Sequence, residues 1–158
     1  MDTPPPPAGG GMSAPRPYRF RGDVAIADVA FEAWGATLED VFVAAADATT
    51  NTMAENLEAI EDRQRRSISL EEGSADLLLF RLLEELIYFK DAEGLLLRVP
   101  AVRIHRRDGG LALEAEARGE PLDPPRHHLQ ADVKAVTLHL LRVEQTTRGW
   151  EAFVVLDI

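Results

Sequence analysis

Residues 74–94, SADLLLFRLLEELIYFKDAEG, give the clearest indication of the fold. Ser74 is a favourable helix N-cap, and apolar residues recur at helical spacing from Leu78 to Phe89. The stretch ends near a turn at residues 91–94. Because the apolar stripe is broad, the pattern predicts a helix covered on much of its surface. We therefore expect it to be the central helix of the fold.

The flanking segments predict one more helix and several strands. Thr37 opens TLED, which resembles a capping box, and helical spacing continues to about Met53, although the triplet at 49–51 weakens its second half. The turn 108–110 (DGG) is a strong hairpin signal. Predicted strands cover 29–34, 63–70, 95–107, 111–118, 133–143 and 150–156. Helices and strands do not alternate one for one, which favours an α+β fold. We expect a single domain with a mixed or antiparallel β-sheet packed against two main helices.

Composition limits the classes of function. Of the 158 residues, 46% are hydrophobic and 28% charged, and the net charge is −10. This charge argues against direct nucleic-acid binding, so a role in an RNA pathway would act through a protein partner. The absence of cysteine excludes thiolate metal sites and cysteine nucleophiles. The apolar stretches are too short to span a membrane.

The first residues, MDTPPPPAGGGMSAPRP, differ in composition from the rest. They lack the basic start and apolar core of a signal peptide, which makes the cytoplasm the expected location. Residues 1–16 are predicted to be a disordered Pro/Gly-rich tail, and 17–158 the folded domain. Met12 is an alternative start.

Acidic residues at two strand ends are candidate metal ligands. Asp28 precedes VAFEAWG, and the apolar strand FVVLDI ends on Asp157 and Ile158. Two aspartates with a terminal carboxylate or carbonyl form an all-oxygen set, which suits Ca²⁺ or Mg²⁺ better than Zn²⁺. The alternative is that each aspartate is a solvated strand-end acid, and spacing alone favours that alternative.

Basic residues and histidines offer further candidates. Lys134, in VKAVTLH, is either a snorkelling side chain or a counter-ion for the aspartates. His139 falls on the opposite face of the same predicted strand, where a satisfied core histidine is the expected role. His127 and His128 are adjacent in a proline-rich loop; in an extended segment they would point apart, so a shared metal ion is not expected.

As an ordered set, these segments resemble the archease family, over nearly everything from about residue 18 to 158. The family's patterns are HTADxxxxAxG, TLEELF, an apolar helix ending in a DTEGLL-like turn, GExFDPxRHxL, EVKAVTYH and a terminal LDI. The corresponding segments are AIADVAFEAWG, TLEDVF, LLEELIYFKDAEGLLL, GEPLDPPRHHL, DVKAVTLH and VVLDI. Three family positions differ: its His and Thr are Ala25 and Ile26 here, and its Tyr is Leu138.

The resemblance implies a non-enzymatic activator of the GTP-dependent RNA-splicing ligase that promotes ligase guanylylation and multiple turnover. It implies a calcium site, with Mg²⁺ as an alternative, formed by Asp28, Asp157 and Ile158, and a functional lysine, Lys134, beside it. The loss of the family histidine at Ala25 bears on that site or on partner binding. Two other readings stay open: a metal-dependent hydrolase with His139 as base, and a chaperone or modulator of RNA modification.

Overall fold

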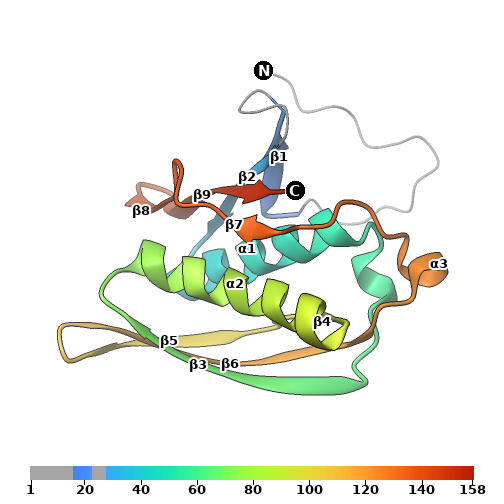
Figure 1. Cartoon of the computed structure of the whole chain (residues 1–158). Helices are drawn as coiled ribbons and strands as arrows, with labels where there is room; N and C mark the ends of the chain where they lie inside the picture. The colour runs from blue at the N-terminus through green and yellow to red at the C-terminus, as the bar shows by residue number, and fades with distance from the viewer. Residues whose placement is uncertain (1–15, 23–27) are drawn as a thin grey trace.

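The computed structural model describes residues 16–22 and 28–158, which form two antiparallel sheets with two long helices between them (Figure 1). Helix α1 (Leu38–Met53) contacts strands of both sheets, and so does α2 (Ala75–Glu93). The predicted α+β class with two main helices is therefore confirmed. The strands divide into two sheets, so that each helix is covered on two sides.

The sheet that carries the candidate site has the order β1-β2-β9-β7, with β8 also paired to β9. Its strands are β1 (Tyr18–Arg21), β2 (Asp28–Gly35), β7 (Ala135–Val136), β8 (Arg142–Thr146) and β9 (Gly149–Asp157). The other sheet has the order β3-β6-β4, with β5 paired to β6. Its strands are β3 (Gln64–Glu72), β4 (Leu95–Arg98), β5 (Val102–Arg107) and β6 (Gly110–Pro121).

Local sequence signals explain where α1 begins and where α2 ends, whereas the Ser74 side chain makes no capping hydrogen bond at the start of α2. The Thr37 hydroxyl accepts a hydrogen bond from the Asp40 N–H at 3.1 Å, which caps the first turn of α1. Helix α2 ends at Gly94, whose φ of 65° is the left-handed conformation that glycine adopts without strain. Two short helical segments complete the set, η1 (Leu57–Ala59) and α3 (Pro124–His127).

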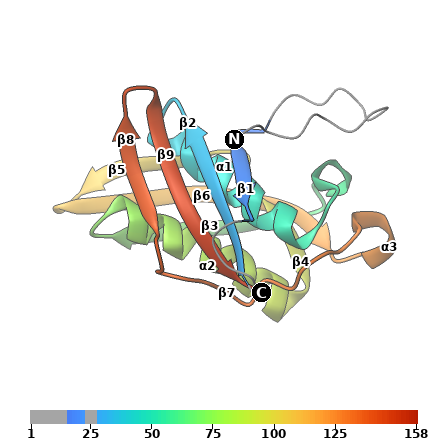
Figure 2. The ribbon, with the colours of Figure 1, turned by 90° about the horizontal axis from the view of Figure 1, so that it is seen from above.

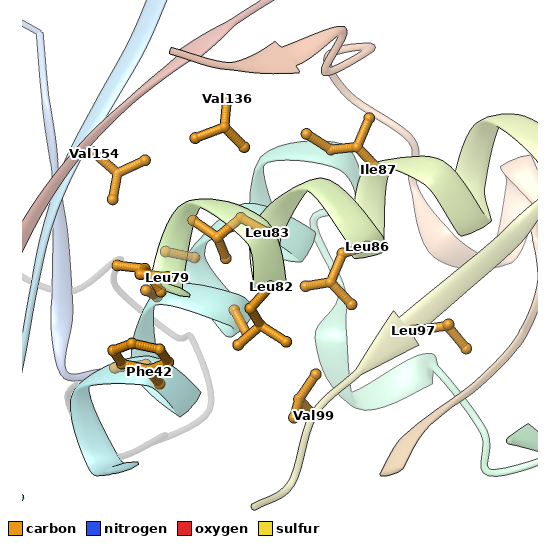
Figure 3. Packing of buried hydrophobic residues seen from close by; sticks show 14 of the residues in the cluster. Phe42, Leu79, Leu82, Leu83, Leu86, Ile87, Leu97, Val99, Val136 and Val154 are labelled. Atoms are coloured by element: carbon orange, nitrogen blue, oxygen red, sulfur yellow. The ribbon is translucent and has the colours of Figure 1, made fainter. Parts of the chain in front are cut away.

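Helix α2 supplies the middle of the core, as its broad apolar stripe predicts. Leu79, Leu82 and Leu83 are fully buried. In Figure 3, Leu79 lies between Phe42 of α1 and Val154 of β9, with Leu82 and Leu83 beside it on α2. The prediction of a central helix is confirmed.

Several predicted boundaries are wrong. The segment 95–107 is two strands, β4 and β5, interrupted around Pro100, which lacks the N–H needed for a strand ladder. The segment 133–143 is not one strand, because pairing stops after Val136 and resumes at Arg142. Strand β1 was not predicted, and part of the proline-rich loop forms α3.

The N-terminal prediction lies outside the described residues. Residues 1–15 are not among those that the structure describes, so the tail and the domain boundary at residue 17 stay predictions. Ala25 and Ile26 also fall outside the described ranges. Within these ranges, no helix is both long and apolar enough to cross a bilayer.

Candidate functional site

Strand register brings the two predicted acidic ligands together. In the antiparallel pair of β2 and β9, Asp28 lies directly opposite Asp157. On the other side of β9, Ala135 of β7 is the partner of Asp157, and the Lys134 N–H donates to the Asp157 carbonyl oxygen at 2.8 Å. Figure 2 shows the chain end at Ile158 beside β7. One end of the sheet thus gathers all four residues singled out in the sequence.

The charges at this sheet end are placed where a solvated ion could reach them. Asp28, Asp157 and Ile158 are each half-buried, and Lys134 is exposed. Directly opposed residues on antiparallel strands have Cβ atoms about 5 Å apart, so the two carboxylates repel each other. Asp28 also lines a groove of about 460 Å³ whose walls include Arg21, Asn51 and Gln130. The arrangement therefore concentrates negative charge at an accessible position.

The donor set fits a hard divalent cation in chemistry. Carboxylate and carbonyl oxygens are the ligands that Ca²⁺ and Mg²⁺ prefer. Within residues 16–22 and 28–158, no group of three or more His, Cys, Asp or Glu side chains is arranged to hold a metal ion. A site at Asp28 and Asp157 would therefore need further oxygens, from Ile158, from water or from a partner. The metal-binding role of these residues stays a prediction.

Lys90 holds the segment that precedes Lys134. From the last turn of α2, its Nζ donates to the Val133 carbonyl oxygen at 2.9 Å and to Asp132 Oδ1 at 2.5 Å. Burial lowers the pKa of Lys90, but hydrogen bonds with Asp132 and Asp91 outweigh this effect and raise the pKa above its ordinary value. Lys90 is therefore a permanent cation that clamps this segment onto α2. Sequence reasoning missed this role; a basic residue in the last turn of a helix was the available signal.

A buried ionic network anchors the loop GEPLDPPRHHL at the other end of the same segment. Glu120 is 1% exposed, and its carboxylate accepts hydrogen bonds from the Glu61 N–H at 2.8 Å and from His127 Nε2 at 2.9 Å. Arg126 Nη2 lies 2.5 Å from the other carboxylate oxygen. Since His127 Nδ1 accepts from the Asp123 N–H, its Nε2 carries the proton. The loop is thereby fixed by interactions that leave the histidine no free ring nitrogen.

The electrostatics of Glu120 follow from these partners. Burial raises the pKa of its carboxyl group, but the hydrogen bonds from Arg126, the Glu61 N–H and His127 outweigh burial and lower the pKa to about 2. Glu120 is therefore ionised at neutral pH. Sequence reasoning did not identify this network, because the glutamate looked like any other charged residue of a loop.

The structure changes the roles expected for the histidines. His139 is exposed in the turn between β7 and β8, so the expectation of a core histidine on a strand is wrong. The chain pairs with Val155 at Thr137 and with Phe153 at Arg142, which places this turn several residues along β9 from Asp157. The hydrolase reading thus gains no support, because its proposed base lies in that turn.

His127 and His128 do point apart, although the segment is a short helix and not extended. His127 is fully buried, whereas the His128 side chain is 62% exposed and its backbone is left-handed. A metal ion shared between these two side chains is thus not compatible with their positions.

The fold and the site together define a class: a two-sheet α+β protein whose first long strand and last strand join two aspartates at one sheet end, beside a lysine. Residues 18–158 match the model of the Archease protein family (MTH1598/TM1083), and the chain belongs to this family. The family resemblance stated from the sequence is therefore confirmed.

Individual relatives agree with this assignment. Protein archease of Thermococcus kodakarensis and that of Pyrococcus abyssi are each 36% identical over 133 residues, which cover 84% of this chain and 93% of each relative. The solution structure of protein 1598 of Methanobacterium thermoautotrophicum is 30% identical, with a TM-score of 0.78 over 90% of this chain and 99% of that one. A Thermotoga maritima crystal structure, described as an archease and possible chaperone, shares the fold at 20% identity and a TM-score of 0.52, over 84% of this chain and 91% of that one. None of these names states a catalytic activity.

Proposed function

We propose that this protein activates the GTP-dependent RNA-splicing ligase of its host, promoting guanylylation of the ligase and its return for further turnovers. The ligase joins a phosphate-ended RNA to a hydroxyl-ended RNA through a guanylylated histidine of its own. The observation that carries the proposal is the pairing of Asp28 with Asp157, next to Lys134. Membership of the archease family supports it, because the family resemblance implies this role.

The proposed site uses Asp28, Asp157 and Ile158 to hold a divalent cation, Ca²⁺ or Mg²⁺. When bound, such a cation supplies positive charge that can pair with phosphate oxygens. The repulsion between the facing carboxylates is the physical reason for a cation to bind here. Lys134 is exposed and its backbone N–H bonds to Asp157, so its amine is available to a partner's phosphate or acidic group near the site.

The net charge of −10 suits this partner. An enzyme that binds the RNA backbone presents a basic surface, and opposite charges accelerate encounter between the two proteins. The same charge disfavours direct contact of this protein with RNA. The acidic sheet end can thus approach a basic cleft that RNA also uses.

The test measures guanylylation and multiple-turnover ligation by the host ligase, with and without this protein, in one defined divalent metal. The wild-type protein is expected to accelerate both reactions. The acceleration given by Asp157→Asn is expected to be at least about tenfold smaller. Glu151→Gln is a matched control, because Glu151 is an exposed acid at the opposite end of β9. This variant is expected to act as the wild type does.

Two outcomes would overturn the proposal. One is an active ligase that the wild-type protein does not accelerate. The other is full acceleration by a folded Asp157→Asn variant. Binding of many unrelated unfolded proteins without preference for the ligase would favour the chaperone reading instead.

A further inference from the structure

The turn Leu138–Leu141, hereafter the LHLL turn, exposes two leucines further along β9 from the candidate site. Leu138 is 62% exposed and Leu140 is 53% exposed. Single exposed apolar residues are common on protein surfaces. Two exposed leucines in one turn leave apolar surface in water and contribute nothing to the core. Leu141, in contrast, packs against the core.

The backbone of this turn is also unusual for its sequence. The Leu141 N–H donates to the Leu138 carbonyl oxygen at 3.3 Å, and Leu140 has a φ of 59°. This left-handed conformation is strained for leucine and is the usual place for glycine or asparagine. An exposed leucine in a strained position stabilises neither the core nor the turn. Such an outlier is evidence for a role outside folding.

The position of the turn connects it to the sheet end. Leu138 follows Lys134 by four residues, and the intervening chain runs along β9 as β7, so the two are separated by about 13 Å. A macromolecule that covers Lys134 and Asp157 therefore also reaches the LHLL turn. Small ions and metabolites could use the acidic site without touching it.

We infer that the LHLL turn is an apolar anchor by which this protein docks on the RNA ligase, next to the acidic sheet end. The inference rests on the proposed function and adds the surface that binds the ligase. Two features favour a basic, RNA-binding protein as the occupant: the net charge of −10, and the continuity of the turn with the site that carries Asp28 and Asp157. Protein interfaces commonly combine an apolar core with a polar rim, and an exposed apolar turn near charged residues matches that arrangement.

The test uses the full chain with Leu138→Ser and Leu140→Asn combined, since asparagine tolerates a positive φ. The double variant is expected to raise the Kd for the ligase at least about tenfold, in a titration followed by fluorescence anisotropy of labelled protein. Its calcium affinity by calorimetry is expected to equal that of the wild type, and its unfolding midpoint to be no lower, because asparagine relieves the strain at residue 140. Trp34→Ser is the control, because Trp34 is 42% exposed at the opposite end of β2.

Each other outcome contradicts the inference in a recognisable way. Unchanged ligase affinity of the double variant means that the turn is not part of the interface. An equal loss in Trp34→Ser means that the effect is not specific to the turn. Dimers of the wild type that dissociate in the double variant, seen by analytical ultracentrifugation, would mean that a second copy covers the turn. A wild-type protein that neither binds nor accelerates the ligase would instead overturn the proposed function itself.

Discussion

Replacing Glu120 by glutamine tests the ionic network that anchors the proline-rich loop. The carboxylate is 1% exposed and is held by Arg126, His127 and the Glu61 N–H. Its pKa falls from 4.5 to about 2 on folding. At 1.36 kcal/mol per pH unit, this difference corresponds to about 3 kcal/mol of folding free energy at neutral pH. Arg126 is one-third exposed, so water screens part of its charge. We therefore expect Glu120→Gln to lower the free energy of unfolding at pH 7 by about 2 kcal/mol.

The sign of the pH dependence follows from the lowered pKa. A carboxyl group with a lower pKa in the folded state stabilises the protein fully above its unfolded pKa of 4.5, and this stabilisation is lost as pH falls towards about 2. The difference in unfolding free energy between the wild type and Glu120→Gln should therefore be largest at pH 7. It should fall below about half of that value by pH 3.

Urea denaturation followed by circular dichroism at pH 7, 5 and 3 measures this difference. Glu116→Gln is the matched control, since Glu116 pairs with Arg65 and Arg118 on an exposed face and should change stability by less than about 0.5 kcal/mol. A Glu120→Gln effect that stays constant from pH 7 to pH 3 would refute the argument. So would an effect no larger than that of the control.

Three further substitutions test individual features of the fold and site. Thr37→Ala removes the cap of α1 and should lower the free energy of unfolding by about 1 kcal/mol in urea denaturation; no change would mean that the hydroxyl does not cap the helix. Gly119→Ala should lower the free energy of unfolding by more than about 3 kcal/mol, because a Cβ there would lie 1.8 Å from the Leu96 carbonyl oxygen. A soluble variant with the wild-type melting temperature would contradict this contact. Asp28→Asn removes the repulsion with Asp157, so with chelator present the free energy of unfolding should rise by up to about 1 kcal/mol. Calcium should no longer raise the melting temperature of this variant. A larger calcium effect than in the wild type would contradict the proposed site.

The helices could be predicted because their signals are local. Capping at Thr37 and the apolar stripe of α2 lie within single segments, and both helices formed where these signals placed them. The weak helix formers near the end of α1 do not interrupt it, for a reason that depends on the packed structure. Thr49 and Thr52 donate to carbonyl oxygens one turn back, while the Thr50 hydroxyl donates to Leu97 across the core.

The strand after the proline-rich loop was misjudged because an apolar run does not by itself indicate burial. Val133 and Val136 are buried, and these fit a strand. Leu138 and Leu140 have the same chemistry but lie in an exposed turn with a left-handed residue. Periodicity cannot distinguish an apolar side chain that faces the core from one that faces a partner.

The candidate site depended on long-range pairing. Nothing in the local sequence places Asp28 opposite Asp157, because their pairing joins the two ends of the described domain. Their oxygen chemistry suggested a ligand set, but spacing alone favoured solvated acids, and the resemblance to a family was what supported the grouping. Lys90 was missed because its partners Asp132 and Val133 lie 42 and 43 residues away in sequence. Glu120 was missed although Arg126 and His127 are close in sequence, because nothing in the local pattern shows that its carboxylate is buried.

The segment that reaches the site is held at four successive points, which explains how an exposed lysine keeps a defined position. Glu120 and its partners fix the loop and α3. The chain then bonds to the end of α1, where the Gln130 N–H donates to Met53 and the Ala131 N–H to Thr52. Lys90 clamps residues 132–133, and the next N–H, that of Lys134, bonds to β9.

Because every one of these contacts is made within the protein, the backbone of the sheet end is organised before any cation or partner binds. Binding then needs to order only the exposed side chains, which lowers its entropic cost. The buried ionic network in a distant loop and the proposed activity at Lys134 are thus parts of one arrangement. His127, although fully buried, therefore contributes to the site by fixing the chain that leads to Lys134.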